Sequence, residues 1–206
     1  MAFFKKLFLS FTTRERIAFI VSSTATVISF FVVAGILIAR ATTAVPMAGG
    51  QFTEGIVGQP EYINPVIADS ETDLDLVKLI FSNVPDIADG IQASPDGKTW
   101  TVRLKNNLYW QDGQKLTSDD VIFTVQAIQD PDADSPSAQN FAGITVSRVS
   151  ELEVQFNLAS PYAFFDDTLQ NLYVIPKHIY ADIPPGNWRL SDYNLKPVGS
   201  GPYQIV

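Results

Sequence analysis

The longest apolar stretch of the chain lies close to its N-terminus. Residues 17–39 form an uncharged run of 23 positions, in which Ser and Thr supply the only polar side chains. A transmembrane helix needs about 20 apolar residues, whereas a cleavable signal has an apolar stretch of about 7–15. The length therefore favours an uncleaved membrane anchor over residues 17–39. Ala39-Arg40-Ala41 has the small-x-small form of a cleavage site, so a cleaved signal is the alternative.

The flanks of this run predict its orientation and the domain limits. Residues 1–16 are basic and amphipathic, and a basic flank is retained on the cytoplasmic side of a membrane. Residues 40–50 contain one proline and two glycines without periodicity, which predicts a linker. Residues 51–206 are then the exported body. It lies in the periplasm or at the cell surface if the anchor is kept, and it is secreted if the signal is cleaved.

An acidic start followed by apolar residues at helical spacing predicts a helix over residues 69–81. Ser70 or Thr72 can cap its first turn, because a hydroxyl oxygen accepts from an otherwise unpaired backbone N–H. The acidic side chains favour the positive end of the helix dipole, and at this spacing they do not converge on a calcium ion. The apolar stripe expected to be buried comprises Leu74, Val77, Ile80 and Phe81.

A second helix is predicted over residues 117–129, shortly after the turn pair Asp112-Gly113. In that pair, Gly accepts a positive φ without steric cost and Asp can bond its own backbone. Thr117 and Asp120 have the spacing of a capping box, in which each side chain accepts from the other residue's backbone N–H. Asp119 adds negative charge at the positive end of the dipole. The expected buried face comprises Val121, Ile122, Val125 and Ile128.

Alternating side chains predict strands on both sides of this second helix. Residues 98–104 place a tryptophan, a valine and a leucine on one face, which is typical of a half-buried antiparallel strand. Residues 141–149 and 153–158 alternate in the same way, and the short connection between them predicts a hairpin. A further short strand is predicted within residues 51–58.

The composition permits a packed core and narrows the possible chemistry. Hydrophobic residues make up 46% of the 206 positions. The chain has no cysteine, which excludes a disulfide framework, cysteine-ligated zinc and a lipid anchor on cysteine. Residues 1–40 carry five basic side chains against one acidic, whereas the remaining 166 residues carry nine against 21. An acidic body argues against a nucleic-acid partner, because such binding needs a basic surface.

No pattern in the chain indicates an enzyme, a metal or a cofactor. His178 is the only histidine, so a usual metal cluster or a histidine-assisted nucleophile has no second member. Asp130-Pro-Asp-Ala-Asp134 begins like a calcium loop, but Ser135 and Phe141 stand where that loop needs Gly and Glu. Gly199-Ser-Gly201 lacks the Gly-x-Ser-x-Gly spacing of a nucleophile elbow.

The most specific signal is an ordered run of residues around the second helix. Trp110-Gln-Asp-Gly-Gln-Lys-Leu-Thr-Ser-Asp-Asp-Val-Ile-Phe123 resembles the signature W-x-D-G-x-x-x-T-A-D-D-V-x-F of family 5 extracellular solute-binding proteins. These are the oligopeptide and dipeptide receptors of ABC importers. Pro197-Val-Gly-Ser-Gly-Pro-Tyr203 resembles a second segment of the family. The family positions with an expected structural role are Asp112, Gly113, Thr117, Asp119, Asp120, Gly199, Gly201, Pro202 and Tyr203.

The resemblance implies a fold and a function for residues 51–206. The fold class is mixed α/β (α+β) and periplasmic-binding-protein-like of class II, here a partial first lobe after one transmembrane helix. Such receptors close two lobes over a peptide about a hinge and deliver it to ABC permease subunits. The chain is expected to be an N-terminal fragment of a receptor, with weak or no peptide binding on its own. The implied partners are a peptide, the permease and the lipid bilayer through residues 17–39, with no nucleic acid.

Two alternatives stay open within this resemblance. The first is a membrane-tethered ectodomain that senses or scaffolds with half of the same fold and does not transport. The second concerns the ligand, because nickel, haem and sugar receptors share the fold and the sequence does not select among them. After Asn83 the chain also departs from the family pattern, since the first half of one segment is missing. This departure is expected to disturb the first sheet and the wall of the cleft.

Residues 59–68 resemble the opening segment of the family, which lies at the lip of the ligand cleft. Gln59, Glu61, Tyr62 and Asn64 are therefore candidate ligand-binding residues that offer polar groups to a peptide. The alternative is a proline-fixed crossover whose side chains face solvent or cap the next helix. Trp110 is a further candidate, either as a stacking platform for the ligand or as a core residue.

Overall fold

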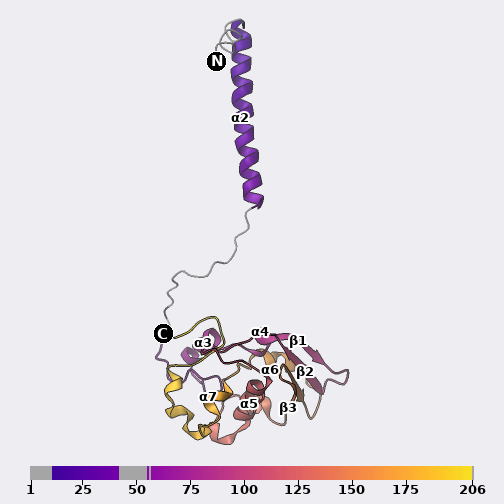
Figure 1. Cartoon of the computed structure of the whole chain (residues 1–206), viewed down its shortest axis with the longest axis vertical. Coiled ribbons are helices and arrows are strands. Elements are labelled where there is room, and N and C mark those ends of the chain that lie inside the picture. Colours follow the sequence, from indigo (N-terminus) through magenta and orange to yellow (C-terminus); the bar gives the residue numbers. More distant parts are fainter. Residues whose placement is uncertain (1–10, 42–54, 56, 206) are drawn as a thin grey trace. The chain divides into compact units, whose positions relative to one another are not determined.

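The computed structural model describes residues 11–41, 55 and 57–205, with the side chains of residues 38–41 excepted (Figure 1). The chain divides into two units, Met1–Glu54 and Gly55–Val206.

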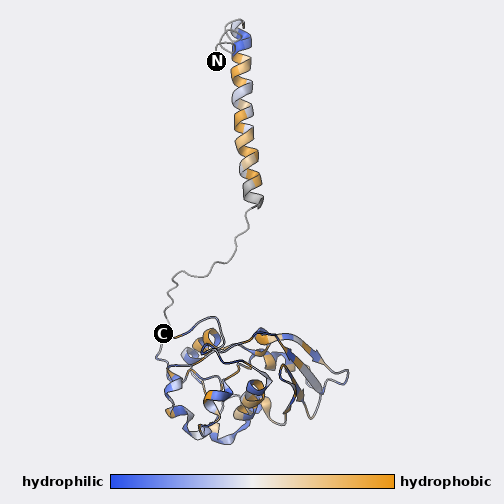
Figure 2. Cartoon of the chain, viewed as in Figure 1, coloured by the Kyte–Doolittle hydropathy of each residue, from blue (hydrophilic) through white to orange (hydrophobic). Residues whose placement is uncertain are grey.

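The described part of the first unit is dominated by one long helix, α2 (Thr13–Ala41). Its 25 residues from Thr13 to Leu37 are long and apolar enough to cross a membrane. At about 1.5 Å per residue they extend for about 37 Å, which exceeds a hydrocarbon core of about 30 Å. In Figure 2 orange, apolar residues alternate with paler ones along most of the helix after its blue first turn, and large side chains such as Phe30 and Phe31 are exposed. Apart from a stripe that holds Ser22, Thr26 and Ser29, the central part of the helix thus presents a largely apolar surface.

The second unit contains a four-stranded antiparallel sheet with the strand order β1-β2-β4-β3. The strands are β1 (Ala88–Ala93), β2 (Thr99–Leu104), β3 (Thr145–Ser150) and β4 (Glu153–Asn157). β3 and β4 form the predicted hairpin, and β4 then pairs with β2 along its whole length. The sheet therefore joins two parts of the chain that are separated by the second predicted helix.

The predicted alternation of the central strand is confirmed. In β2, Val102 and Leu104 are buried whereas Arg103 between them is exposed. Val102 lies opposite Val154 of β4, and both side chains are completely buried. One face of the sheet therefore contributes to the core.

Helix α5 (Ser118–Gln129) covers this core and packs against β3 and β4. The predicted capping box is present. The Asp120 carboxylate accepts from the backbone N–H of Thr117, and the Thr117 hydroxyl accepts from the backbone N–H groups of Asp119 and Asp120. Val121, Val125 and Ile128 are buried as predicted, and Ile122 is half-buried against the core. The local sequence signals therefore place both the start and the buried face of α5.

Helix α3 (Glu71–Ile80) begins at the predicted cap Ser70, whose hydroxyl oxygen accepts from the backbone N–H of Asp73 at 3.1 Å. Val77, Ile80 and Phe81 are buried as predicted, but Leu74 is 41% exposed, so its place in the buried stripe was wrong. Asp73 is buried instead. Its carboxylate is drawn inward because it accepts from backbone N–H groups that precede the helix.

The region after Asn83 departs from the family pattern but is regular. Asn83 caps the short helix α4 (Val84–Ile87), and β1 follows it directly. β1 pairs with β2 with one register shift between Ala88 and Gly90. Even with the shorter sequence, β1 therefore forms one edge of the sheet.

Short helices complete the second unit. They are η1 (Pro131–Ala133), η2 (Ala138–Phe141), α6 (Phe165–Gln170), α7 (Lys177–Tyr180), η3 (Pro185–Leu190) and η4 (Asp192–Asn194). Trp188 of η3 is buried and packs its ring 5.3 Å from that of Tyr180. The short strand predicted within residues 51–58 lies largely outside the described residues.

Candidate ligand-binding site

The candidate lip, residues 59–64, is held by one buried carboxylate. Asp73 Oδ1 accepts from the backbone N–H groups of Glu61 at 2.9 Å and Tyr62 at 3.2 Å. Its other oxygen accepts from the Ser70 hydroxyl at 2.7 Å. Gln59 and Glu61 are exposed, and Tyr62 is half-buried. The backbone of the lip is thus fixed from the side of α3, while two of its polar side chains stay accessible.

Asn64 lies inside the fold rather than on the lip surface. The residue is fully buried, and its Oδ1 accepts from the backbone N–H of Val66 at 3.0 Å. Its backbone carbonyl accepts from the N–H of Ala68 at 2.9 Å. These bonds form a tight turn after the lip. The burial favours the alternative in which Asn64 shapes the crossover.

Arg189 of η3 connects the lip to two acidic residues. Its guanidinium lies 4.9 Å from the centre of the Tyr62 ring. It also lies 3.8 Å from a carboxylate oxygen of Asp69 and 3.8 Å from one of Asp134. A hollow of about 300 Å³ lies next to it, and its lining includes Glu61, Arg189 and two residues of η4, Asp192 and Asn194. Charged groups of both signs therefore surround the accessible side chain of Glu61.

The turn after Trp110 is built from its own backbone and one carboxylate. Gly113 has φ +87°, and the N–H of Trp110 donates to the carbonyl of Gln114 at 2.8 Å. Asp112 Oδ1 accepts from the Gln114 N–H at 3.0 Å, and Asp112 Oδ2 lies 2.7 Å from His178 Nε2. Burial raises the pKa of Asp112, but these two contacts outweigh it and hold the pKa below its ordinary value.

Trp110 belongs to the core. Its side chain is 2% exposed, and its ring lies 6.4 Å from the His178 ring in an edge-on arrangement. In this structure the indole has no accessible face on which a ligand could stack. The burial of Trp110 therefore favours its role as a core residue over a role as a stacking platform for the ligand.

Asp120 ties the start of α5 to the start of α7. Its Oδ2 accepts from the Thr117 N–H at 2.8 Å, and its Oδ1 accepts from the Lys177 N–H at 2.9 Å. Burial raises the pKa of Asp120, and these hydrogen bonds oppose that effect only in part. Asp119 is half-buried and pairs with Arg148 at 3.2 Å. Asp119 and Asp120, both predicted as family positions, therefore make contacts within the fold.

The glycine segment, residues 199–203, runs against the C-terminal end of α3. The Gly201 N–H donates to the Ile80 carbonyl at 2.8 Å, and the Tyr203 N–H donates to the Leu79 carbonyl at 3.2 Å. A Cβ atom on Gly201 would lie 2.7 Å from that Ile80 carbonyl, and one on Gly199 would overlap it. Glycine is required at both positions because the two backbones come so close.

Gln111 holds the other side of the glycine segment, and the sequence did not single it out. Its Nε2 donates to the carbonyls of Gly201 at 3.2 Å and Tyr203 at 2.7 Å, and its Oε1 accepts from the Gly199 N–H at 3.1 Å. Its backbone N–H donates to the Gly199 carbonyl at 2.9 Å. In the family signature Gln111 is the unspecified position between Trp110 and Asp112, so the motif gave no signal for it.

The described residues contain no group of three or more His, Asp or Glu side chains that could hold a metal ion. The accessible groups of the candidate site are an amide, a carboxylate and a phenol ring under a guanidinium. Such groups can bind a polar ligand through hydrogen bonds and charge.

Comparisons with known proteins place these features in a family. The model of bacterial extracellular solute-binding proteins, family 5 Middle, matches residues 83–206. The oligopeptide-binding protein AppA of Bacillus subtilis is 26% identical over 180 residues, covering 81% of this chain and 33% of that protein. The dipeptide-binding protein of Escherichia coli is 28% identical over 181 residues, covering 72% and 34%. The chain thus spans about a third of the length of these curated relatives.

Solved structures agree with this placement. The ABC transporter substrate-binding protein CtaP of Listeria monocytogenes is 36% identical with a TM-score of 0.67, over 73% of this chain and 33% of that one. AppA of B. subtilis, solved in complex with a nonapeptide, is 25% identical with a TM-score of 0.66, over 71% and 32%. The predicted mixed α/β fold of this class of binding protein is confirmed.

Proposed function

Because the chain belongs to the bacterial extracellular solute-binding proteins of family 5, we propose that it acts in the substrate-binding component of an ABC importer for peptides. In this role it captures peptides outside the membrane and delivers them to the permease. The observation that carries the proposal is the family match over residues 83–206. It includes the capped helix α5, the turn after Trp110 and the glycine segment.

The ligand contacts proposed for this chain are Gln59, Glu61 and Tyr62. Gln59 and Glu61 are exposed on a backbone that Asp73 fixes, so their side chains can bind without ordering the segment first. Glu61 can accept from a peptide N–H group or from an amino terminus. Asn64 supports these contacts from inside the fold through the turn that follows the lip, whereas Trp110 is assigned to the core.

Residues 17–39 are proposed to anchor the domain in the cytoplasmic membrane. Residues 1–16 would then lie in the cytoplasm, residues 40–50 would be the linker and residues 51–206 the exported domain. The length of α2 and its apolar surface support an anchor. Cleavage of this segment as a signal is the alternative, and the mass of the protein isolated from source cells separates the two.

The test is peptide uptake by cells of the source organism. Deleting the coding sequence is expected to reduce uptake of a radiolabelled tripeptide, and restoring it is expected to recover uptake. Unchanged uptake after deletion would overturn the importer role and favour a tethered sensor or scaffold.

A further inference from the structure

A hollow with exposed aromatic rings lies between η2 and α6, away from the lip. It has a volume of about 390 Å³, and its lining includes Asn140, Tyr162, Phe164 and Asp167. Tyr162 is 46% exposed and Phe164 is 64% exposed, and their rings lie edge to face at 6.1 Å. We call this feature the aromatic hollow. None of the lip residues contributes to it.

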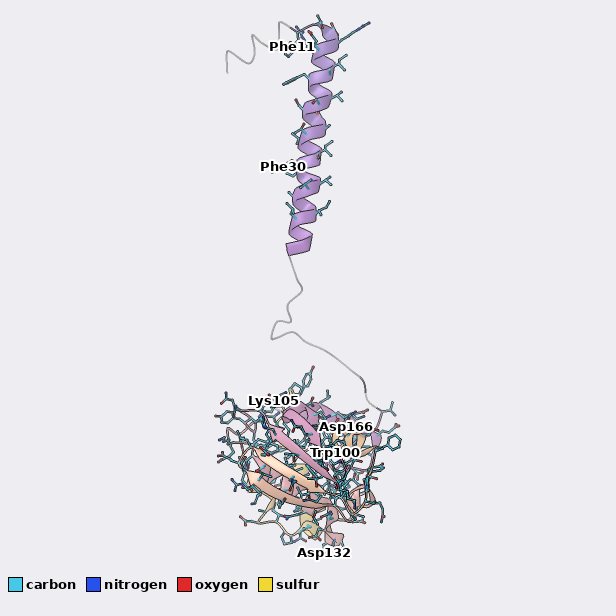
Figure 3. The ribbon with its side chains drawn as sticks, turned by 90° about the vertical axis from the view of Figure 1, so that its right-hand side faces the viewer. Phe11, Phe30, Trp100, Lys105, Asp132 and Asp166 are labelled. Atoms are coloured by element: carbon cyan, nitrogen blue, oxygen red, sulfur yellow. The ribbon has the colours of Figure 1, made fainter. Side chains whose placement is uncertain are left out.

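The two rings are exposed because their neighbour Phe165 takes the place in the core. Phe165 is completely buried and packs its ring 5.4 Å from Trp100 and 5.6 Å from Phe156. Trp100 and Asp166, the residue that follows Phe165, are labelled in Figure 3. With α6 anchored in this way, Phe164 and Tyr162 pack on each other in solvent. Exposed apolar patches beside polar groups are typical of interaction sites.

The charge around the aromatic hollow is negative and uncompensated. Asp166 and Asp167 are both exposed at the start of α6. Among the described residues, neither carboxylate takes part in an ion pair. Asp166 accepts from the Gln170 amide, whereas the Asp167 carboxylate accepts none of the hydrogen bonds found in the described part of the chain. A cation is therefore the complementary group.

Polar groups at the rim add capacity for hydrogen bonds. The Asn171 Nδ2 donates to the Asp167 carbonyl at 2.8 Å, which leaves its Oδ1 as an acceptor. The Asn140 amide and the Tyr162 hydroxyl take part in none of the side-chain hydrogen bonds among the described residues. These groups can bind the backbone of a peptide whose charged side chain enters the hollow.

We propose that the aromatic hollow binds a lysine- or arginine-bearing segment of a partner protein. The cationic head lies between the Asp167 carboxylate and the ring faces of Phe164 and Tyr162. A cation within about 6 Å of a ring centre is attracted by the ring, and a nearby carboxylate adds charge attraction. The surface goes beyond the peptide contacts proposed for the lip, with which it shares no residue.

The experiment is an NMR titration of the full chain in detergent micelles. The probes are two end-blocked peptides, acetyl-Ala-Arg-Ala-amide and acetyl-Ala-Gln-Ala-amide, so that only the central side chain differs and no free terminus is present. The arginine peptide is expected to shift the ring signals of Tyr162 and Phe164 with millimolar affinity. The glutamine peptide is expected to bind at least about 5-fold more weakly.

Variants assign the binding to the aromatic hollow. Phe164→Ala and Asp167→Asn are each expected to weaken binding of the arginine peptide by about 3-fold or more. Phe164→Tyr keeps an aromatic ring at this position and is expected to retain binding of the arginine peptide. Asp182→Asn removes the same charge from another exposed position and is the matched control. All three substituted positions are exposed, and unchanged unfolding midpoints would verify that the fold is intact.

Three results would overturn the proposal. They are an absence of shifts at the two rings, equal shifts with both peptides, and equal weakening by Asp182→Asn and Asp167→Asn. The readout is direct binding, so it does not depend on whether the chain supports peptide uptake.

Discussion

The lip and the glycine segment are both irregular stretches of backbone held by α3 and its surroundings, yet they differ in what they leave free. Asp73 and the Asn194 carbonyl hold the backbone of residues 61–63, and the side chains of Gln59 and Glu61 stay in solvent. The glycine segment is held on both sides, by the last carbonyls of α3 and by Gln111.

The difference matches the roles proposed for the two segments, ligand contact for the lip and contact within the fold for the glycine segment. In the lip, a fixed backbone with exposed polar side chains keeps those side chains available at a low entropic cost of binding. The glycine segment instead has its backbone polar groups engaged in hydrogen bonds and has no room for side chains at Gly199 and Gly201. Substitutions in the glycine segment are therefore expected to act on stability, and substitutions in the exposed lip on ligand binding.

The largest expected effect is that of Gly201→Ala. The added Cβ atom would lie 2.7 Å from backbone atoms of Ile80, which cannot move away as a flexible side chain would. We expect the free energy of unfolding to fall by about 3 kcal/mol. Denaturant unfolding of the full chain in detergent measures this change. Gly90→Ala is the control, since its Cβ meets no atom within 4 Å and should change stability by less than about 1 kcal/mol.

Asp73→Ala is expected to have the next largest effect. It leaves the N–H groups of Glu61 and Tyr62 and the Ser70 hydroxyl without their acceptor. The expected loss of unfolding free energy is about 2 kcal/mol. Asp75→Ala on the same helix removes an exposed carboxylate paired with Lys78 and should cost less than about 1 kcal/mol. Equal losses for the two variants would contradict a buried anchor of the lip.

Gln111→Ala is expected to cost about 1–2 kcal/mol, because it removes three hydrogen bonds to the glycine segment. Hydrogen exchange of the Gly199 and Tyr203 amides should become faster in this variant. Gln114→Ala in the same turn removes an exposed side chain and should leave both rates unchanged. Slow exchange in Gln111→Ala would mean that α3 alone fixes the segment.

The smallest effect is a pH dependence through Asp112. Its pKa is lowered in the folded state, so the stability it contributes is present above its unfolded pKa of about 3.9 and is lost as the pH falls through the folded value. Acid unfolding curves of the wild type and Asp112→Asn should therefore converge at low pH. A constant gap between the two curves down to low pH would contradict this assignment.

Sequence reasoning succeeded where the deciding contacts are local. The capping box at Thr117 and Asp120 lies within three residues, so spacing alone predicts it. The hairpin of β3 and β4 is equally local. In both cases side-chain pattern and hydrogen bonding act over the same short range.

Sequence reasoning failed where a side chain forms a hydrogen bond with a backbone group that is distant in the sequence. Asp73 is buried in place of Leu74 because it accepts from residues 61 and 62, outside its helix. Gln111 bonds to groups about 90 positions later, and no periodicity encodes that contact. The exposed residues of the lip, Gln59 and Glu61, were predicted as ligand contacts from the resemblance, and that role stays a prediction.

The central claim is that the lip contacts the ligand, whereas the glycine segment makes contacts within the fold. Its most direct test is peptide uptake by cells that carry Glu61→Gln in place of the wild-type chain. Protein abundance and the unfolding midpoint are measured in parallel. The account predicts that uptake of a radiolabelled tripeptide falls by at least about 5-fold at unchanged abundance and midpoint, since a charged hydrogen bond is worth about 1.5–3 kcal/mol. Unchanged uptake with an intact fold would contradict a ligand role for the lip.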